Sequence, residues 1–513
     1  MIAYPEISRK LHIPHIQHVE SNNLDYDSQR LHDLGYKQEF KREVSLFVQA
    51  GFSFTTMAVL PNWMVGFGPS INAGGPSSLF WGWIVVAPFV CCIALSMAEV
   101  ISSYPLEGGV FSWSLMLSNK KWGPFMSYIN GYVYLIGLVT ANITLGYSAA
   151  DFIIYIANTL NIAQITSQGA TVGLYCAIFI VATGYNFLGM RFSSYLNKFL
   201  VFWVGIGTII IVCTVPAMAP NLNNAKWVFT EFTNNTGYES VAIVFFVGML
   251  QAGWTLVGYE CGAQIVEGTK RADVTAPRGI IICVASAIVQ GFAIILVTLF
   301  SIQDVNEIIE SEMPLSTFFL RATNSPQLTA FFLVILLLAQ FGSLCNSMLA
   351  TGHFAFALAR DGCLPFSSYF SKLSENNNVP RRALFAQLVI SILVIMPTFA
   401  SVIYWQAIMS AAVISINVAY GIPFLCRLIW VRNDMPRGPF SLGRFGLVLN
   451  FISVVWIIFF SIILCIPSIS PVTPDTMNWA SAMIGGVMIF SLFFWFISGR
   501  KNYGGKTNNG GKQ

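Results

Sequence analysis

An acidic side chain lies inside a long apolar stretch of the chain. Glu260 falls in the run 240–265, together with Gly253, Trp254 and Gly258. An ionisable group at membrane depth is costly unless it is paired, so such groups mark ion or substrate pathways. We expect Glu260 to balance the ammonium group of a substrate or to carry a proton. The alternative is an architectural role, in which Glu260 bonds to unwound backbone.

The aromatic neighbours of Glu260 suit the recognition of a cation. An indole such as that of Trp254 attracts an ammonium group over its ring face by about 0.5–2 kcal/mol. Tyr259 stands directly beside Glu260. The alternative is that Trp254 only packs against the protein or faces lipid.

A second apolar run, 45–69, carries polar residues followed by a helix breaker. Thr55, Thr56 and Met57 precede Pro61 in this run. Proline and glycine weaken helical hydrogen bonding, and free N–H groups at a break can hold a carboxylate. The threonines could equally bond to the preceding turn of their own helix. The predicted substrate site consists of the following residues from the two runs: Thr55, Thr56, Met57, Gly253, Trp254, Gly258, Tyr259 and Glu260.

The overall composition determines where these runs must lie. Hydrophobic residues make up 55% of the 513 residues and charged residues 10%, against about 25% charged in an ordinary soluble domain. A soluble fold is therefore excluded, and the surface must face lipid. The net charge is only +4 and the basic residues are scattered, so we expect no nucleic acid partner. The ten cysteines form neither a CxxC pair nor a cluster, and we expect no disulfide, metal or other cofactor.

Apolar runs of about 20 residues recur along the chain, the length that an α-helix needs to cross the hydrocarbon core. Residues 1–43 are polar and lack a signal peptide, so we expect a cytosolic tail there and a second tail at 499–513. We predict an all-α integral membrane protein with a transporter domain over 44–498. Its twelve transmembrane helices are expected at 45–69, 79–103, 123–149, 171–188, 196–217, 240–265, 278–301, 327–355, 381–400, 403–428, 445–467 and 477–498.

Basic residues are distributed unequally between the two sets of loops. With a cytosolic N-terminus, all but two of the 27 Lys and Arg residues lie on the cytosolic side, the exceptions being Lys226 and Arg321. A missed or invented helix would destroy this separation, so we predict that both termini are cytosolic. The sequon that begins at Asn234 would then lie outside, where a glycan could be added.

The two interrupted runs, 45–69 and 240–265, each open a group of five helices. This placement points to an inverted repeat with a substrate site at the midplane, although glycine and proline also serve close helix packing in membranes. We predict repeat one at about 45–217, repeat two at about 240–428 and two extra helices at about 445–498.

Several segments resemble the amino acid–polyamine–organocation transporters. AEVISSYPLEGG at residues 98–109 is similar to the AExxSxYPxxGG segment of that superfamily. The entry LGY to RE over 34–43 is most similar to the fungal amino acid/choline branch, which includes GABA, choline, polyamine and biotin-precursor permeases. Further matches are WGPF at 122–125, GYE at 258–260, EGTK at 267–270, APR at 276–278 and ARDGCLP at 359–365.

The resemblance implies the LeuT-like five-plus-five inverted repeat with two additional helices. It also implies that Trp254 stacks over the substrate and that Glu260 lies beside it, as in the helix 6 stretch of bacterial amino acid exchangers. Fungal members often have Asp, a small residue and His after the helix 6 Tyr, whereas this chain continues from Tyr259 with Glu260 and Cys261.

Charged residues at the inner end of helix 2 suit a gate or a structural salt bridge. By topology Glu99 and Glu107 are expected near Lys120, Lys121 and Arg191. In helix 8, His353 could relay protons or be a satisfied helix-end histidine. Near the C-terminus, GGKT at 504–507 resembles a phosphate-binding loop but lacks the required glycine at position 500, so we expect no nucleotide site there.

The function we predict is secondary active transport of a small amine-bearing solute, such as an amino acid or GABA, by alternating access. Choline, a polyamine or a vitamin precursor is the alternative cargo, with proton symport as one source of energy. A nutrient sensor usually adds a long folded tail, and a membrane-embedded enzyme needs a catalytic cluster at one depth. We expect no enzymatic activity, and we expect the plasma membrane rather than the vacuolar membrane.

Overall fold

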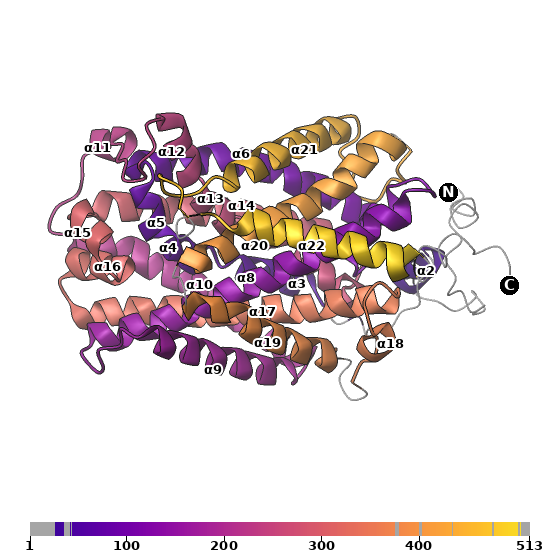
Figure 1. The fold of residues 1–513 in the computed structure, drawn as a ribbon, viewed down its shortest axis with the longest axis horizontal. Helices are drawn as coiled ribbons and strands as arrows, with labels where there is room; N and C mark the ends of the chain where they lie inside the picture. Colours follow the sequence, from indigo (N-terminus) through magenta and orange to yellow (C-terminus); the bar gives the residue numbers. More distant parts are fainter. Residues whose placement is uncertain are drawn as a thin grey trace.

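Long apolar helices make up most of the structure (Figure 1). The computed structural model describes residues 26–34, 42, 44–374, 379–399, 403–432, 434–473, 477–500 and 503. Within these ranges, strand pairing is limited to two isolated bridges, Val44 with Thr269 and Ala73 with Asn234. The GGKT segment at 504–507 lies outside the described residues, as does most of the predicted N-terminal tail.

Eleven segments of the described residues are long and apolar enough to cross a membrane, and they match eleven of the twelve predicted spans. Eight of them are α6 (Gly75–Ser103), α8 (Gly123–Thr159), α9 (Gln168–Asn186), α10 (Met190–Met218), α14 (Ala272–Ser301), α17 (Pro326–Arg360), α21 (Phe445–Leu464) and α22 (Ala480–Phe494), which η5 (Trp495–Gly499) continues. The other three are composite: α12 (Val241–Gly248), α13 (Leu250–Thr255) and η2 (Tyr259–Gly268); α19 (Arg381–Ile395) and η3 (Met396–Phe399); and α20 (Ile403–Cys426) and η4 (Arg427–Val431).

The remaining predicted span, 45–69, is divided into three short helices. These are α3 (Leu46–Met57), α4 (Val59–Val65) and α5 (Phe67–Asn72). Ala58 separates the first two, because its φ of 40° is left-handed and ends α3. No single helix here reaches the length of a span, although the segment as a whole does.

Several helices extend beyond the predicted spans. The third predicted span ends at residue 149, whereas α8 continues to Thr159, and α14 begins at Ala272 rather than at 278. Hydropathy marks only the part of a helix that faces hydrocarbon, and a helix can continue into the polar interface because its backbone hydrogen bonds are internal. The sequence therefore located the spans but underestimated the helix lengths.

The burial pattern separates central from peripheral helices. In its most apolar stretch, α8 is 89% buried, and the segment formed by α20 and η4 is 83% buried. The corresponding values are 28% for α10 and 17% for α22 with η5, and α10 exposes large apolar side chains such as Phe202 and Ile209. Exposed apolar faces on peripheral helices are what a lipid environment requires.

The two ends of the bundle carry different elements. The short helices α2 (Tyr26–Asp33) and α18 (Ser367–Phe370) lie at one end, and α11 (Ala225–Thr230), α15 (Val305–Glu310) and α16 (Pro314–Thr323) lie at the other (Figure 1). The linker helix α7 (Gly109–Met116) follows α6. We call the end that holds α2 and α18 the basic end, because Lys120, Lys121, Arg360 and the loop 432–444 belong to it.

Candidate substrate site

Two helix breaks face each other in the middle of the bundle. One is at Ala58, between α3 and α4, and the other lies between Thr255, the last residue of α13, and Tyr259, the first of η2. Gly258 in the second break has a φ of 105°, and a Cβ there would lie 3.5 Å from the backbone nitrogen of Met57. A glycine is therefore required for this conformation and allows the two breaks to meet.

Side chains satisfy the carbonyl groups that the first break releases. The Asn62 amide donates to the Met57 carbonyl at 2.7 Å, and the Ser343 hydroxyl donates to the Thr56 carbonyl at 2.6 Å. The first N–H groups of α4 have no partner within their own helix, as at any helix start. The break is thus held in place on its carbonyl side.

A small cavity lies where the two breaks meet. Its volume is about 30 Å³, room for a few water molecules at most. An amino acid does not fit into this volume, so the walls would have to move apart to admit one. The residues that line it come from five of the twelve spans: Thr56, Asn62, Leu138, Ala141, Leu145, Trp254, Val257, Gly258, Glu260, Cys261, Ser347 and Ile416.

Glu260 is the charged residue among the cavity walls, and it is fully buried. The Tyr134 hydroxyl of α8 donates to Oε1 of Glu260 at 3.1 Å. Among the described residues, Oε2 of Glu260 makes no hydrogen bond of good geometry, and the Tyr420 hydroxyl of α20 is a further group that interacts with the carboxylate. A buried acceptor without a donor destabilises the protein, and a donor on a bound ligand would remove that cost.

Trp254 also lines the cavity and is buried. Its indole N–H has no hydrogen-bond partner within the described part of the chain. The walls therefore combine one aromatic ring and one carboxylate with the polar side chains of Thr56, Asn62 and Ser347, and the ring and the carboxylate together match an ammonium group on a small molecule.

Of the eight predicted substrate residues, four lie on the cavity and four do not. Thr56, Trp254, Gly258 and Glu260 line it. Thr55 is directed elsewhere, because its hydroxyl contacts the side chains of Asn197 and Asn346, at 2.7 and 2.8 Å.

Met57, Gly253 and Tyr259 serve packing around the breaks rather than the cavity wall. The sulfur of Met57 lies 3.3 Å from that of Cys283 on α14. A Cβ at Gly253 would meet the Phe460 ring at 2.5 Å, so Gly253 gives α21 room to approach. Tyr259 packs against Tyr420, with ring centroids 5.7 Å apart.

Several residues at the site were not predicted from the sequence. Asn62 follows Pro61 directly, and its position after a breaker could have suggested a capping role. Ser347 and Tyr134 lie in the middle of long apolar runs, where one polar residue among many carries little information. Their inward direction follows from the packing of α8 and α17 around the breaks.

The predicted partners of Glu99 were wrong. Its Oε2 accepts from Arg427 at 2.6 Å, and its Oε1 accepts from the Leu442 backbone at 3.0 Å. Lys120, Lys121 and Arg191 are exposed and make no ion pair among the described residues. A buried carboxylate needs a partner at its own depth, and Arg427 at the end of α20 supplies it.

Glu107 likewise pairs with residues other than the predicted ones. Its Oε1 lies 2.5 Å from Nδ1 of His353, and its backbone N–H donates to Glu267, which also pairs with Arg360 at 3.2 Å. Burial raises the pKa of Glu107 to about 7, while the adjacent His353 opposes part of that rise. His353 is thus a buried, partnered histidine that links α17 to the segment after α6.

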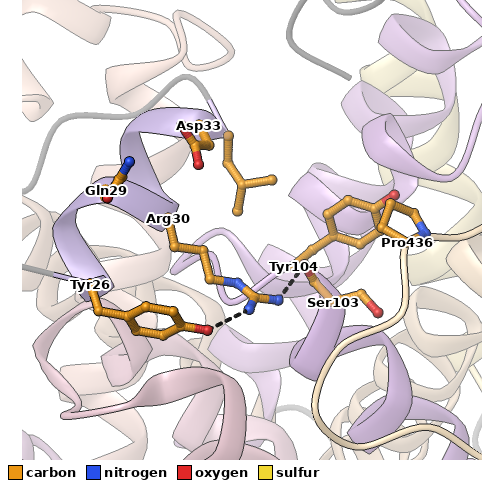
Figure 2. Close-up of a pocket in the computed structure, with 8 residues that line it drawn as sticks. Tyr26, Gln29, Arg30, Asp33, Ser103, Tyr104 and Pro436 are labelled. Atoms are coloured by element: carbon orange, nitrogen blue, oxygen red, sulfur yellow. Dashed lines mark hydrogen bonds between the residues drawn. The ribbon is translucent and has the colours of Figure 1, made fainter. Parts of the chain in front are cut away.

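A larger cavity lies at the basic end, beneath α2 (Figure 2). It measures about 150 Å³, and Arg30 points into it beside Tyr104 and Ser103. Arg30 donates to the Ser102 carbonyl at 2.7 Å and pairs with Asp273 at 3.1 Å. Its walls contain no residue of the two breaks, so we assign this cavity to the docking of α2 and not to the substrate site.

Apolar helices around two facing breaks define a multi-pass integral membrane protein of the transporter class. The family model "Amino acid permease" matches residues 44–489, most of the chain. The chain belongs to this family, which confirms the resemblance to the amino acid–polyamine–organocation superfamily and its five-plus-five fold with two additional helices. The protein is accordingly a transporter of amino acids and not an enzyme.

Curated relatives come from plants and fungi. The chain is 31% identical to the amino-acid permease BAT1 homolog of Oryza sativa subsp. japonica, over 94% of this chain and 95% of that protein. It is 29% identical to the amino-acid permease BAT1 of Arabidopsis thaliana, over 95% and 97%. It is 27% identical to the amino-acid permease 2 of Neurospora crassa, over 94% and 90%. The similarity therefore extends beyond the fungal branch.

Proposed function

We propose that the protein is a secondary active transporter for a small amine-bearing solute, an amino acid or GABA, which binds between α4 and the α13–η2 break. The observation that carries the proposal is the small cavity where both breaks meet, with Glu260 and Trp254 in its wall. The substrate ammonium would lie between Glu260 and Trp254, and its carboxylate would face the first N–H groups of α4.

The size of the cavity supports alternating access as the mechanism that we propose. With about 30 Å³ the site is too small for any amino acid, so binding requires the walls to separate on one side and release requires separation on the other. The buried pairs Glu99–Arg427 and Glu267–Arg360 lie at the basic end, where their rupture would accompany opening toward that side. Glu99 and Glu107, through its contact with Glu267, are our candidates for the inner gate. Among the described residues, Arg191 makes no ion pair with either of them.

Glu260 is the candidate for energy coupling. It either neutralises the substrate ammonium or takes up the coupling proton, and each role uses the same buried carboxylate. The basic end faces the cytosol in this proposal because Lys and Arg accumulate in cytosolic loops. Residence in the plasma membrane stays a prediction, which microscopy of a tagged chain would check.

Uptake by proteoliposomes tests the proposal. The purified chain is reconstituted and supplied with radiolabelled neutral amino acids, GABA, choline, putrescine or thiamine, with and without an inward proton gradient. We expect accumulation of an amino acid or GABA. Accumulation of choline, putrescine or thiamine alone would favour the alternative cargo, and binding without uptake would identify a sensor.

A further inference from the structure

A second cavity at the basic end is surrounded by arginines. It measures about 190 Å³ and lies between the end of α6, the end of α20 with η4, and the loop 432–444. Four guanidinium groups, those of Arg427, Arg432, Arg437 and Arg444, share its wall with one carboxylate, Glu99. Cytosolic loops of membrane proteins are rich in basic residues, but those charges usually spread apart. Here the four arginines line one cavity.

The single carboxylate is already engaged. Both oxygens of Glu99 are used, one by Arg427 and the other by the Leu442 backbone and the Ser441 hydroxyl. Arg432, Arg437 and Arg444 are exposed and make no ion pair with any described residue. Asp434, the acidic residue of the same loop, is exposed and does not line the cavity. Three positive charges around the space are therefore uncompensated.

A buried donor on the same wall also lacks a partner. Arg427 is only 4% exposed, and its Nε has no hydrogen-bond acceptor among the described residues. A buried charged donor left unsatisfied costs more than a neutral one, so an anion in the cavity would relieve this cost. Arginine is the residue that matches phosphate oxygens best, because its planar group donates two parallel hydrogen bonds.

The cavity lies next to the surface that faces lipid. Arg444 directly precedes α21, whose first turns expose Phe445 by 62% and Val448 by 54%. On the other side Ile429 of η4 is 50% exposed. The arginines thus sit where apolar surface gives way to water, which is the depth of phospholipid head groups. Basic pockets between helices at this depth suit anionic head groups.

We propose that the cavity formed by Arg427, Arg432, Arg437 and Arg444 binds a phosphate-bearing anion, namely the phosphorylated head group of a membrane lipid. The acyl chains of that lipid would lie along Phe445 and Val448. Free phosphate has the same anionic oxygens as the head group but no apolar part that would contact Phe445 and Val448. The loop 432–444 joins the last helix of repeat two to α21, and its residues Ser441 and Leu442 donate hydrogen bonds to Glu99. A lipid bound to this loop would therefore influence the Glu99–Arg427 pair of the inner gate.

Lipid binding to the purified full-length chain tests the site. The probes are short-chain phosphatidylinositol 4-phosphate, short-chain phosphatidylserine, and inorganic phosphate, each measured by native mass spectrometry and by ligand-induced thermal stabilisation. The test variant is Arg432→Gln/Arg437→Gln/Arg444→Gln, which changes only exposed side chains. The matched control is Lys120→Gln/Lys121→Gln/Lys372→Gln, which removes the same charge from exposed positions at the basic end.

We expect the wild type and the control to bind one molecule of phosphatidylinositol 4-phosphate, and the test variant to bind it at least about tenfold more weakly. Both variants should melt at the wild-type temperature without lipid, which shows that they fold. Equal weakening in the control or unchanged binding in the test variant would overturn the site. Equal binding of phosphatidylserine, which carries no additional phosphate on its head group, would overturn the assignment to a phosphorylated head group. Inorganic phosphate binding as tightly as the lipid would overturn the assignment to a lipid.

Discussion

Glu260 is the charged side chain in the wall of the candidate substrate cavity. It is fully buried, receives a hydrogen bond from Tyr134 and keeps one oxygen that makes no hydrogen bond of good geometry in the described structure. Glu260→Gln preserves the shape and most hydrogen bonds but removes the charge. We expect weaker transport with a flattened pH dependence, measured as uptake by proteoliposomes at several pH values.

The assay also separates the two roles of Glu260. A charge-balancing carboxylate loses affinity for cationic substrates when neutralised, whereas a proton carrier keeps binding and exchange but loses accumulation against a gradient. Glu310→Gln, which neutralises an exposed carboxylate on α15, is the control. If Glu260→Gln showed normal affinity, accumulation and pH profile, Glu260 would have only an architectural role.

Trp254 is expected to contribute through its ring face. We predict that Trp254→Ala lowers substrate affinity by roughly tenfold, the loss of about 1–2 kcal/mol of stacking. Competition binding to the purified protein measures this change, with Trp122→Ala as a control because Trp122 is exposed. If the affinity for every transported substrate stayed the same, Trp254 would have to be removed from the site.

Glu107 predicts a pH effect on stability. Its pKa rises from an ordinary value of 4.5 to about 7 in the folded chain, so folding favours its protonated form. This contribution is complete below pH 4.5 and is lost as the pH rises through about 7. The neutral variant Glu107→Gln should therefore gain stability relative to wild type on going from about pH 5 to pH 8, by an amount on the order of 2 kcal/mol.

Thermal unfolding of both chains at the two pH values measures this difference. Glu310→Gln again serves as control, and a stability difference that does not change with pH would contradict the prediction.

At the scale of elements, α2 is held to the bundle by the buried Leu31 and by an ion pair. Arg30 joins α2 to the start of α14 through Asp273 and to the end of α6 through the Ser102 carbonyl. Arg30→Gln breaks the ion pair and leaves the buried Asp273 without this cation, a change that is strongly unfavourable. We expect faster hydrogen exchange in residues 26–33 and unchanged exchange in η2. Gln29→Ala, on the exposed side of α2, should leave both segments as they are.

At the scale of the whole molecule, the loops predict the orientation in the membrane. All but two of the 27 Lys and Arg residues belong to one set of loops and tails, so both termini should be cytosolic. A C-terminal tag should survive protease added to right-side-out vesicles, and a tag beside the exposed Asn234 should be removed. Removal of the C-terminal tag would reverse the topology, and with it the side that the gate faces.

Much of this architecture could be predicted because membrane helices obey local rules. A run of about 20 apolar residues must be helical in hydrocarbon, since no water is present to satisfy its backbone. Pro61 and Gly258 mark breaks for equally local reasons, namely a missing N–H group and a positive φ. The helix order, the two interrupted spans and the family similarity therefore follow from the sequence.

Tertiary structure alone decided which side chains meet. Thr55 and Thr56 are neighbours with the same chemistry, yet only Thr56 reaches the cavity, because α3 packs its other face against Asn197 and Asn346. Glu99 pairs with Arg427, which lies 328 residues further along the chain. No spacing in the sequence predicts such a pair. By itself the sequence determined where helices run and where they break. The rotation of each helix, and hence the partner of every buried charge, depends on how the whole bundle packs.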